Sequence, residues 1–199
     1  RAPLRDVLSA WSGLGYNRRA KFLHEAAQII VQEYRGIMPN NFSALIKLSG
    51  VGAGTAGAIL AFAFKKPSAF IETNIRSVFL FFFFKNKKSV SDKEILPLVK
   101  QTLDMNNPRE WYYALMDYGT MLKEKYKNPN RKSVHYVKQS SFKNSNRQVR
   151  GEILKLLTVH SRMPIRRLNN AINAEMRCLH HALDQLQKAP LAGLHRRDL

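Results

Sequence analysis

The chain has 199 residues, with 33 Lys and Arg against 14 Asp and Glu, so its formal net charge is +19. Apolar residues make up 45% of it, enough for one medium or two small hydrophobic cores, which argues against a disordered chain. The positive charge is spread along the length and favours a polyanionic partner such as DNA or RNA.

Neither a membrane span nor a signal peptide is expected. The apolar run 78–84 is too short to cross a bilayer and predicts a buried helix. No signal-peptide pattern opens the chain, and no amphipathic anchor is evident. The single cysteine, Cys178, excludes an internal disulfide and a cysteine-ligated metal cluster. This usage fits a reduced, cytoplasmic setting, associated with the nucleoid if the source is bacterial.

Apolar periodicity and turn residues predict an all-α fold, because convincing strand alternation is missing. Two helices are expected within 4–35, split by the glycines of 12–15. A helical hairpin follows at 42–64. Ser91 is expected to cap the second of the next three helices, which are predicted at 74–84, 92–103 and 109–122.

A boundary is expected within 127–146, where Lys, Asn, Ser, Pro and Arg dominate. It separates a domain at 1–137 from a small basic module at 138–199. Three helices are predicted in this module, at 146–159, 164–173 and 174–188. With a β wing they would form a winged-helix-like module that reads DNA or docks a partner. A small helical bundle that serves only packing is the alternative.

The hairpin is the most informative segment. Its first apolar stretch runs into Ser49-Gly50-Val51-Gly52, and the second follows at once. Glycines at alternate positions allow positive φ and the close approach of another molecule. The second helix begins with free N–H groups and the positive end of its dipole, which suits a phosphate. A plain tight turn is the alternative interpretation.

Four segments closely resemble the helix-hairpin-helix DNA glycosylases of the endonuclease III superfamily, and most of all its MutY-type adenine branch. In chain order they are Trp11–Tyr16, the hairpin at 48–60, Ile71–Arg76 and Trp111–Gly119. The resemblance implies a helix-hairpin-helix glycosylase (HhH-GPD) domain of base-excision repair in 1–137. The DNA-contacting residues that follow from the hairpin and the resemblance are Tyr16, Gly50, Val51, Gly52, Gly54, Thr55 and Arg76. Tyr16 would wedge into the base stack and help to flip a nucleotide; a buried core tyrosine is the alternative.

Glu72 and Asn74 are the candidate catalytic residues. Hydrolysis of a glycosidic bond passes through an oxocarbenium-like sugar, which a nearby carboxylate stabilises. Glu72 is the only carboxylate between Glu33 and Asp92, and it occupies a position where the family usually has aspartate. The alternative for Glu72 is an exposed loop acid. The resemblance places Asn74 beside the carboxylate, and capping of the next helix is its other expected role.

The sequence departs from the family pattern in two places. Gly54 stands where bifunctional relatives carry a nucleophilic lysine, so a monofunctional reaction with water as nucleophile is expected. The segment after Gly119 lacks the four cysteines of the family's iron–sulfur cluster, so no cofactor is expected. None of the six histidines has persuasive metal-ligand spacing. A monovalent cation at the hairpin is compatible with the sequence. The family also has a segment before the position of Arg1, with the glutamate that protonates the departing base, and we expect such a segment to be missing here.

The sequence therefore predicts a monomeric, monofunctional DNA N-glycosylase that hydrolyses the N-glycosidic bond of a flipped base. The expected substrate is double-stranded DNA with a mispaired or damaged base, and adenine in a mispair is the expected target. One alternative is a non-catalytic helix-hairpin-helix DNA-binding protein that keeps the scaffold. A second is a sequence-specific regulator that acts through 146–199.

Overall fold

The computed structural model describes residues 2–143, 145–160 and 162–188. Within these ranges the regular elements are ten α-helices and one 3-10 helix, and no strand is present, which confirms the all-α prediction. An isolated bridge between Val90 and Ser133 is the sole strand-like pairing there. The chain divides into two compact units, 1–36 with 139–199 and 37–138. Among the described residues no helix is long and apolar enough to cross a membrane.

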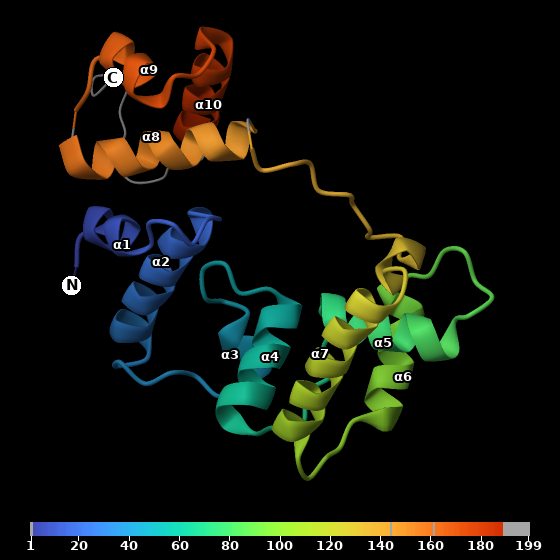
Figure 1. The fold of residues 1–199 in the computed structure, drawn as a ribbon. Coiled ribbons are helices and arrows are strands. Elements are labelled where there is room, and N and C mark those ends of the chain that lie inside the picture. The colour runs from blue at the N-terminus through green and yellow to red at the C-terminus, as the bar shows by residue number, and fades with distance from the viewer. Residues whose placement is uncertain (1, 144, 161, 189–199) are drawn as a thin grey trace. The chain divides into compact units, whose positions relative to one another are not determined.

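The first unit combines the two ends of the chain. It holds α1 (Leu4–Ala10), α2 (Arg18–Glu33), α8 (Asn146–His160), α9 (Ile165–Ile172) and α10 (Met176–Lys188). Helix α8 packs on α1, α9 and α10 (Figure 1). Arg5 joins the two segments, since its guanidinium donates hydrogen bonds to the carbonyl oxygen of Thr158 at 3.0 and 2.8 Å. These bonds satisfy a carbonyl near the C-terminal end of α8, where intrahelical partners run out.

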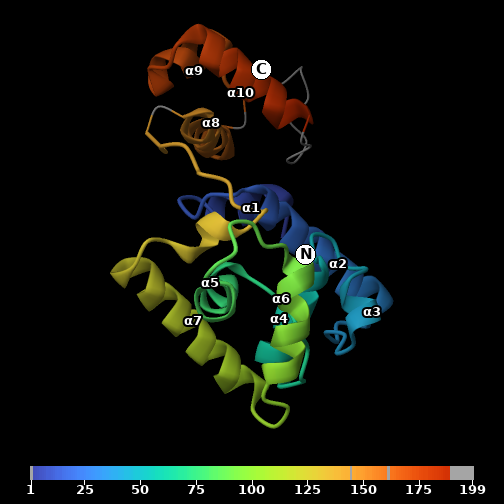
Figure 2. The same ribbon diagram turned by 90° about the vertical axis from the view of Figure 1, so that its right-hand side faces the viewer.

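The second unit is built around α5. It comprises α3 (Phe42–Leu45), α4 (Ala53–Phe64), α5 (Thr73–Phe83), α6 (Asp92–Thr102), α7 (Pro108–Lys125) and the 3-10 helix η1 (Pro129–Lys132). Helix α5 packs against α6, α7 and η1 (Figure 2). Tyr112 is fully buried in this core, where its hydroxyl donates to Ser68 O at 2.8 Å and accepts from Phe70 N at 3.1 Å. Burial raises the pKa of Tyr112 to about 12, so the hydroxyl keeps its proton.

The predicted helices are found with small shifts at their ends. Ser91 is the N-cap of α6, as predicted, and its backbone N–H donates to the Glu94 carboxylate at 2.9 Å. One prediction needs correction: the run 78–84 is buried only at its start, because Phe82 and Phe83 are exposed at the end of α5. The division at 138/139 lies one residue from the predicted boundary, whereas the division after Gly36 was not predicted.

The C-terminal module consists of α8, α9 and α10, which confirms the three helices predicted there. Its core is made of the residues that these helices turn toward one another, including Ile153, Leu168 and Leu179, all fully buried. The described residues of 146–188 form no strand. A wing that follows α10 would lie outside the described residues, so the winged-helix prediction stays a prediction.

Candidate functional site

The hairpin turn connects a short first helix to α4. Leu45 and Leu48 are buried and anchor the first side of the turn. Gly50 has φ +72°, a conformation that glycine adopts without strain. Gly52 then serves as the N-cap of α4 in extended conformation, with no side chain to accept from the helix N–H groups. The turn between the two helices is therefore present at Gly50, and its contact with a phosphate stays a prediction.

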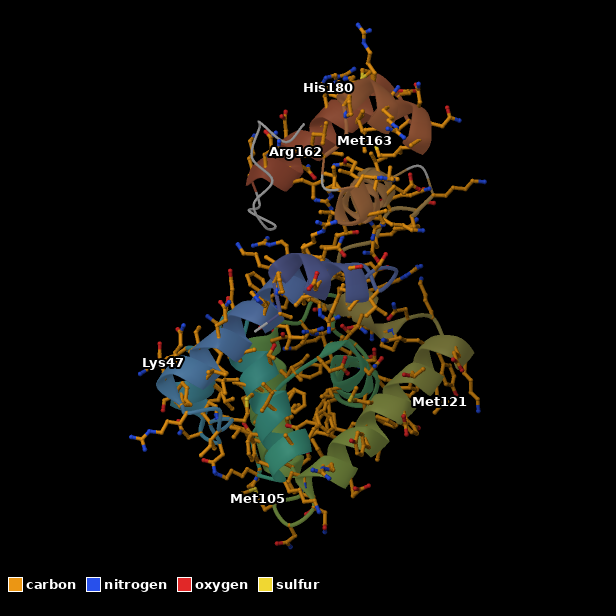
Figure 3. All side chains as sticks on the ribbon, turned by 90° about the vertical axis from the view of Figure 1, so that its left-hand side faces the viewer. Lys47, Met105, Met121, Arg162, Met163 and His180 are labelled. Carbon is orange, nitrogen blue, oxygen red and sulfur yellow. The ribbon has the colours of Figure 1, made fainter. Side chains whose placement is uncertain are left out.

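The start of α4 is open to a ligand. Gly52, Gly54 and Thr55 are exposed, and Val51 is half-buried. A Cβ at Gly52 would meet nothing within 4 Å, so this backbone faces open space. Lys47, labelled in Figure 3, is exposed just before the turn. Free N–H groups at a helix N-terminus, next to a lysine, suit a phosphate.

We expect Gly52→Asp to weaken duplex DNA binding by about tenfold or more, because its charge and bulk oppose a phosphate. The backbone of Gly52, with φ −88° and ψ 177°, accepts any residue, and aspartate is a good N-cap. The variant should therefore fold normally by circular dichroism. Gly52→Asn is the matched control, since it adds similar bulk without charge and should lose less affinity in a fluorescence titration. Unchanged affinity of Gly52→Asp would contradict a phosphate at this turn.

Glu72 is the N-cap of α5. Its Oε1 accepts hydrogen bonds from the backbone N–H groups of Asn74 and Ile75, at 2.6 and 2.9 Å. The carboxylate is thus held at the positive end of the helix dipole, and the residue is half-buried. The alternative interpretation of Glu72, an exposed loop acid, is wrong. The expected capping role of Asn74 is taken by Glu72, which caps through its side chain while Asn74 supplies a backbone N–H.

Three polar side chains hold the first turn of α5. Lys123 on α7 donates a hydrogen bond from Nζ to Oδ1 of Asn74. Asn130 in η1 donates from Nδ2 to Thr73 O at 2.9 Å and to Ser77 Oγ. Ser77 donates in turn to Thr73 O at 2.9 Å. Asn130 is 3% exposed, and its amide must be oriented this way because the Thr73 carbonyl can only accept.

These contacts, here called the α5 clamp (Ser77, Lys123 and Asn130), were not predicted from the sequence. Lys123 lies 49 residues from Asn74 in the chain, and Asn130 lies 57 residues from Thr73, so no local pattern links them. A further lysine of the same segment, Lys132, donates to the carbonyl oxygens of Phe84 and Lys85 at 3.1 and 2.7 Å. Residues 123–132 therefore hold α5 at both of its ends. The clamp thus connects the first turn of α5, and with it the segment of Glu72, to α7 and η1.

Glycines set the approach of the neighbouring helices to this segment. A Cβ at Gly57 on α4 would lie 2.7 Å from the Cβ of Phe70, so glycine allows α4 to pack against the chain that precedes Glu72. A Cβ at Gly119 on α7 would lie 2.7 and 2.8 Å from backbone C and Cα of Asn74. Because Gly57 and Gly119 have no side chain, α4 and α7 can both pack closely against the segment that contains Glu72.

Arg76 has an internal partner in the structure, and its predicted contact with DNA stays a prediction. Its guanidinium forms two hydrogen bonds with the Asp92 carboxylate, at 2.7 and 2.8 Å. The side chain of Arg76 is 14% exposed and that of Asp92 is 33% exposed. A buried guanidinium needs an anionic partner, and the first residue of α6 supplies it. Hydrogen bonding to Arg76 lowers the pKa of Asp92 against the opposing effect of burial.

We expect Asp92→Asn to lower the free energy of unfolding by about 1 kcal/mol near neutral pH, a value discounted for the exposure of Asp92. Because the pKa of Asp92 is lower in the folded state, its stabilisation is present above the unfolded pKa and is lost as pH falls through the folded pKa. Urea titrations from about pH 7 down to about pH 3 should show the parent losing this difference in acid. Glu110→Gln, which changes an acid in the first turn of α7, is the control. Equal losses in both variants would contradict the ion pair.

Tyr16 belongs to the first unit and is 66% exposed, so the buried-core alternative is wrong. Its φ of +51° lies in the left-handed region, which is unusual for a tyrosine. The hydroxyl accepts a hydrogen bond from Gln139 Nε2 at 2.8 Å. The loop before it is shaped by Trp11, whose indole N–H donates to Gly15 O at 2.9 Å. An exposed aromatic ring on a fixed loop remains available to a ligand.

No group of three His, Cys, Asp or Glu side chains among the described residues is placed to share a metal ion. Cys178 is exposed on α10. The candidate site of the second unit thus consists of three parts. They are the hairpin turn with its open helix N-terminus, the Glu72 carboxylate that caps α5, and Asn74, which is hydrogen-bonded to Lys123. Such a set can bind a nucleic-acid backbone and present a negative charge next to it.

Known proteins with similar sequences are adenine DNA glycosylases, although no family model matches the chain. The enzyme of Buchnera aphidicola subsp. Baizongia pistaciae is 36% identical over 125 residues, which cover 61% of this chain and 35% of that protein. The one from Mycobacterium tuberculosis is 43% identical over 77 residues, 39% of this chain and 25% of the relative. The one from Arabidopsis thaliana is 35% identical over 121 residues, 59% of this chain and 19% of the relative.

A solved structure of a thermostable thymine-DNA glycosylase resembles the chain with a TM-score of 0.56 and 26% sequence identity. The alignment covers 66% of this chain and 62% of that one. The chain spans only about a third or less of the length of the curated relatives; its match covers 35% of the Buchnera protein. The sequence matches and the structural match thus both relate the chain to DNA glycosylases.

Proposed function

We propose that this chain, which belongs to the helix-hairpin-helix DNA glycosylase superfamily, acts as a monofunctional DNA N-glycosylase of base-excision repair. The relationship to adenine DNA glycosylases extends over about 60% of the chain. The observation that carries the proposal is the Glu72 carboxylate, which two backbone N–H groups hold at the start of α5. It lies in the same compact unit as the open hairpin turn.

In the proposed reaction the hairpin binds a backbone phosphate and the flipped nucleotide reaches the Glu72 segment. The glycosidic bond breaks with positive charge developing on the sugar, and the Glu72 carboxylate stabilises that charge. The α5 clamp keeps the carboxylate in place, so little reorganisation is needed as the charge develops. The base departs with the bonding electron pair and takes up a proton. A water molecule then bonds the sugar carbon and loses a proton in its place, because glycine at position 54 offers no amine for a Schiff base.

Adenine in a mispair is the proposed target, since the relatives that are 36% and 43% identical over the matched residues are adenine DNA glycosylases. Thymine is the second candidate, because the superposed structure is a thymine-DNA glycosylase. Single-turnover base release from A·G, A·8-oxoguanine and T·G duplexes decides between them. We expect adenine to be released. Release of thymine alone would contradict adenine as the target and assign thymine in its place.

A non-catalytic DNA-binding protein is the second candidate function. The observation that favours it is the capping role of Glu72, which gives this carboxylate a structural reason to be present without any chemistry. Such a protein would bind duplex DNA through the hairpin and release no base from any of the three duplexes. The base-release experiment therefore separates the two candidates.

A further inference from the structure

Helices α9 and α10 form a helix-turn-helix element. Helix α9 ends at Ile172, and α10 begins at Met176, so a turn of three residues connects them. Asn173 adopts the left-handed conformation, with φ 51° and ψ 46°, and its N–H donates to Asn169 O at 2.8 Å. The chain therefore reverses sharply at a residue type that tolerates this conformation. Two helices joined in this way are the arrangement of DNA-binding helix-turn-helix motifs.

The core of the module uses only the inner faces of these helices. Leu168 of α9, Leu179 and Ala182 of α10 and Ile153 of α8 are all fully buried together. Helix α8 packs against both helices. The outer face of α10 is therefore not required to close the hydrophobic core.

The outer face of α10 carries donors at its N-terminal end. Arg177, His180 and His181 are exposed there, and His180 is labelled in Figure 3. The Nδ1 of His180 contacts Met176 O at 2.9 Å, and His181 contacts Gln185 at 2.9 Å, so both rings have a defined orientation. Two acids, Glu175 and Asp184, are also exposed near this face.

Charge around the element is complementary to a phosphate backbone. Arg166 and Arg167 are exposed on α9, the helix that crosses the backbone in such motifs. Residues 146–188 contain eight Lys and Arg against three Asp and Glu. The 13 residues of α10 span about 20 Å, and an α-helix of ordinary diameter fits a major groove about 12 Å wide.

We propose that α10 is the recognition helix of a second DNA-binding surface, which enters the major groove of duplex DNA while α9 contacts the backbone. This surface belongs to the first unit, whereas the hairpin belongs to the second. It adds affinity for duplex DNA and takes no part in breaking the glycosidic bond. The proposal therefore stands whether or not the chain releases a base.

Alanine variants test this surface in the intact protein. We expect Arg177→Ala and the double variant Arg166→Ala/Arg167→Ala each to weaken binding to an undamaged duplex by about five- to tenfold. The slope of log K against log salt should become shallower by about 0.9 for each phosphate that the variant no longer neutralises. The matched control is Lys155→Ala, which removes an exposed charge from α8 and should change affinity less than about twofold. Circular dichroism should be unchanged in every variant.

Cys178 offers a direct second measurement, because it is the only cysteine and is exposed next to Arg177 on α10. A DNA-cleaving iron chelate attached to Cys178 should cut bound duplex DNA on the strands that flank one major groove. The same reagent placed by Lys155→Cys in a Cys178→Ser background should cut weakly or not at all. If the Cys178 conjugate leaves DNA uncut, or the arginine variants bind as tightly as Lys155→Ala, the surface does not contact DNA. Arginine variants that bind DNA normally but no longer bind an acidic protein would likewise overturn the proposal.

Base release distinguishes this proposal from the proposed function. With DNA at saturating concentration, the α9 and α10 variants should release base at the same single-turnover rate as the parent. A parent that releases no base, together with weakened binding in these variants, would reject the glycosylase assignment and keep the second surface. A reduced single-turnover rate at saturation would place α10 in the catalytic machinery and overturn its assignment as a separate binding surface.

Discussion

Replacement of Glu72 by glutamine is expected to abolish base release while leaving the fold and duplex affinity nearly unchanged. Glutamine cannot stabilise the developing positive charge on the sugar electrostatically, so the barrier should rise by several kcal/mol, a loss on the order of 10³ or more in rate. The amide oxygen of glutamine can still accept the two hydrogen bonds from Asn74 and Ile75 that Glu72 accepts now. The cap of α5 is therefore kept, and loss of rate cannot be attributed to loss of structure.

The measurement is single-turnover release of base from mispaired duplexes, with parent and variant side by side. Glu72→Asp is the control, because it keeps the charge and caps helices well. It should retain measurable activity, whereas Glu72→Gln should not. If parent and Glu72→Gln release base at equal rates, the catalytic assignment of Glu72 is wrong. If neither the parent nor Glu72→Asp releases any base, the non-catalytic function replaces the enzyme.

The largest effect on stability is expected for Gly119→Ala. The added Cβ would lie 2.7 and 2.8 Å from backbone C and Cα of Asn74 and closer still to its carbonyl oxygen. Backbone atoms cannot rotate away, so α5 and α7 must separate and the hydrogen bond between Lys123 and Asn74 must change. We expect the free energy of unfolding to fall by about 3 kcal/mol, the upper end of the usual cost of overpacking. The melting temperature should drop by about 10 °C.

Gly151→Ala provides the matched control for this substitution. Gly151 lies within α8, and a Cβ there would meet nothing within 4 Å. Alanine is the better helix former, so the control should be neutral or more stable by about 0.5–1 kcal/mol. Thermal unfolding followed by circular dichroism measures both variants. A Gly119→Ala protein as stable as the parent would show that α5 and α7 are not packed as closely as the structure has them.

The hairpin illustrates what can be inferred from local sequence. Its two glycines, the apolar residues before them and the small residues after them all lie within a short stretch of chain, and each acts through its own backbone or its immediate neighbours. A glycine with positive φ in the turn was accordingly expected and is found at Gly50, whereas Gly52 has φ −88° and serves as the N-cap of α4. The same holds for Ser91 and the other helix ends, which depend on residues about three or four positions away.

The roles of Arg76 and Tyr16 show where local information is insufficient. The position of Arg76 in the Glu72 segment suggested a contact with DNA, but its partner Asp92 lies 16 residues further on, in another helix. Whether a cation faces DNA or an internal carboxylate depends on how α5 and α6 are packed. Tyr16 fits a buried or an exposed position equally well by composition, and only the structure shows that it is exposed.

By itself, the sequence determined the helical class, the approximate ends of the helices, the hairpin turn and the position of one carboxylate after it, because these depend on periodicity and on short-range backbone conformation. The tertiary structure decided the α5 clamp, the Arg76–Asp92 ion pair, the close contact at Gly119 and the packing of residues 1–36 with 139–199. Each of these joins side chains or backbone from segments distant in the chain. Their free energies arise from burial and hydrogen bonding between helices, and no single segment contains that information.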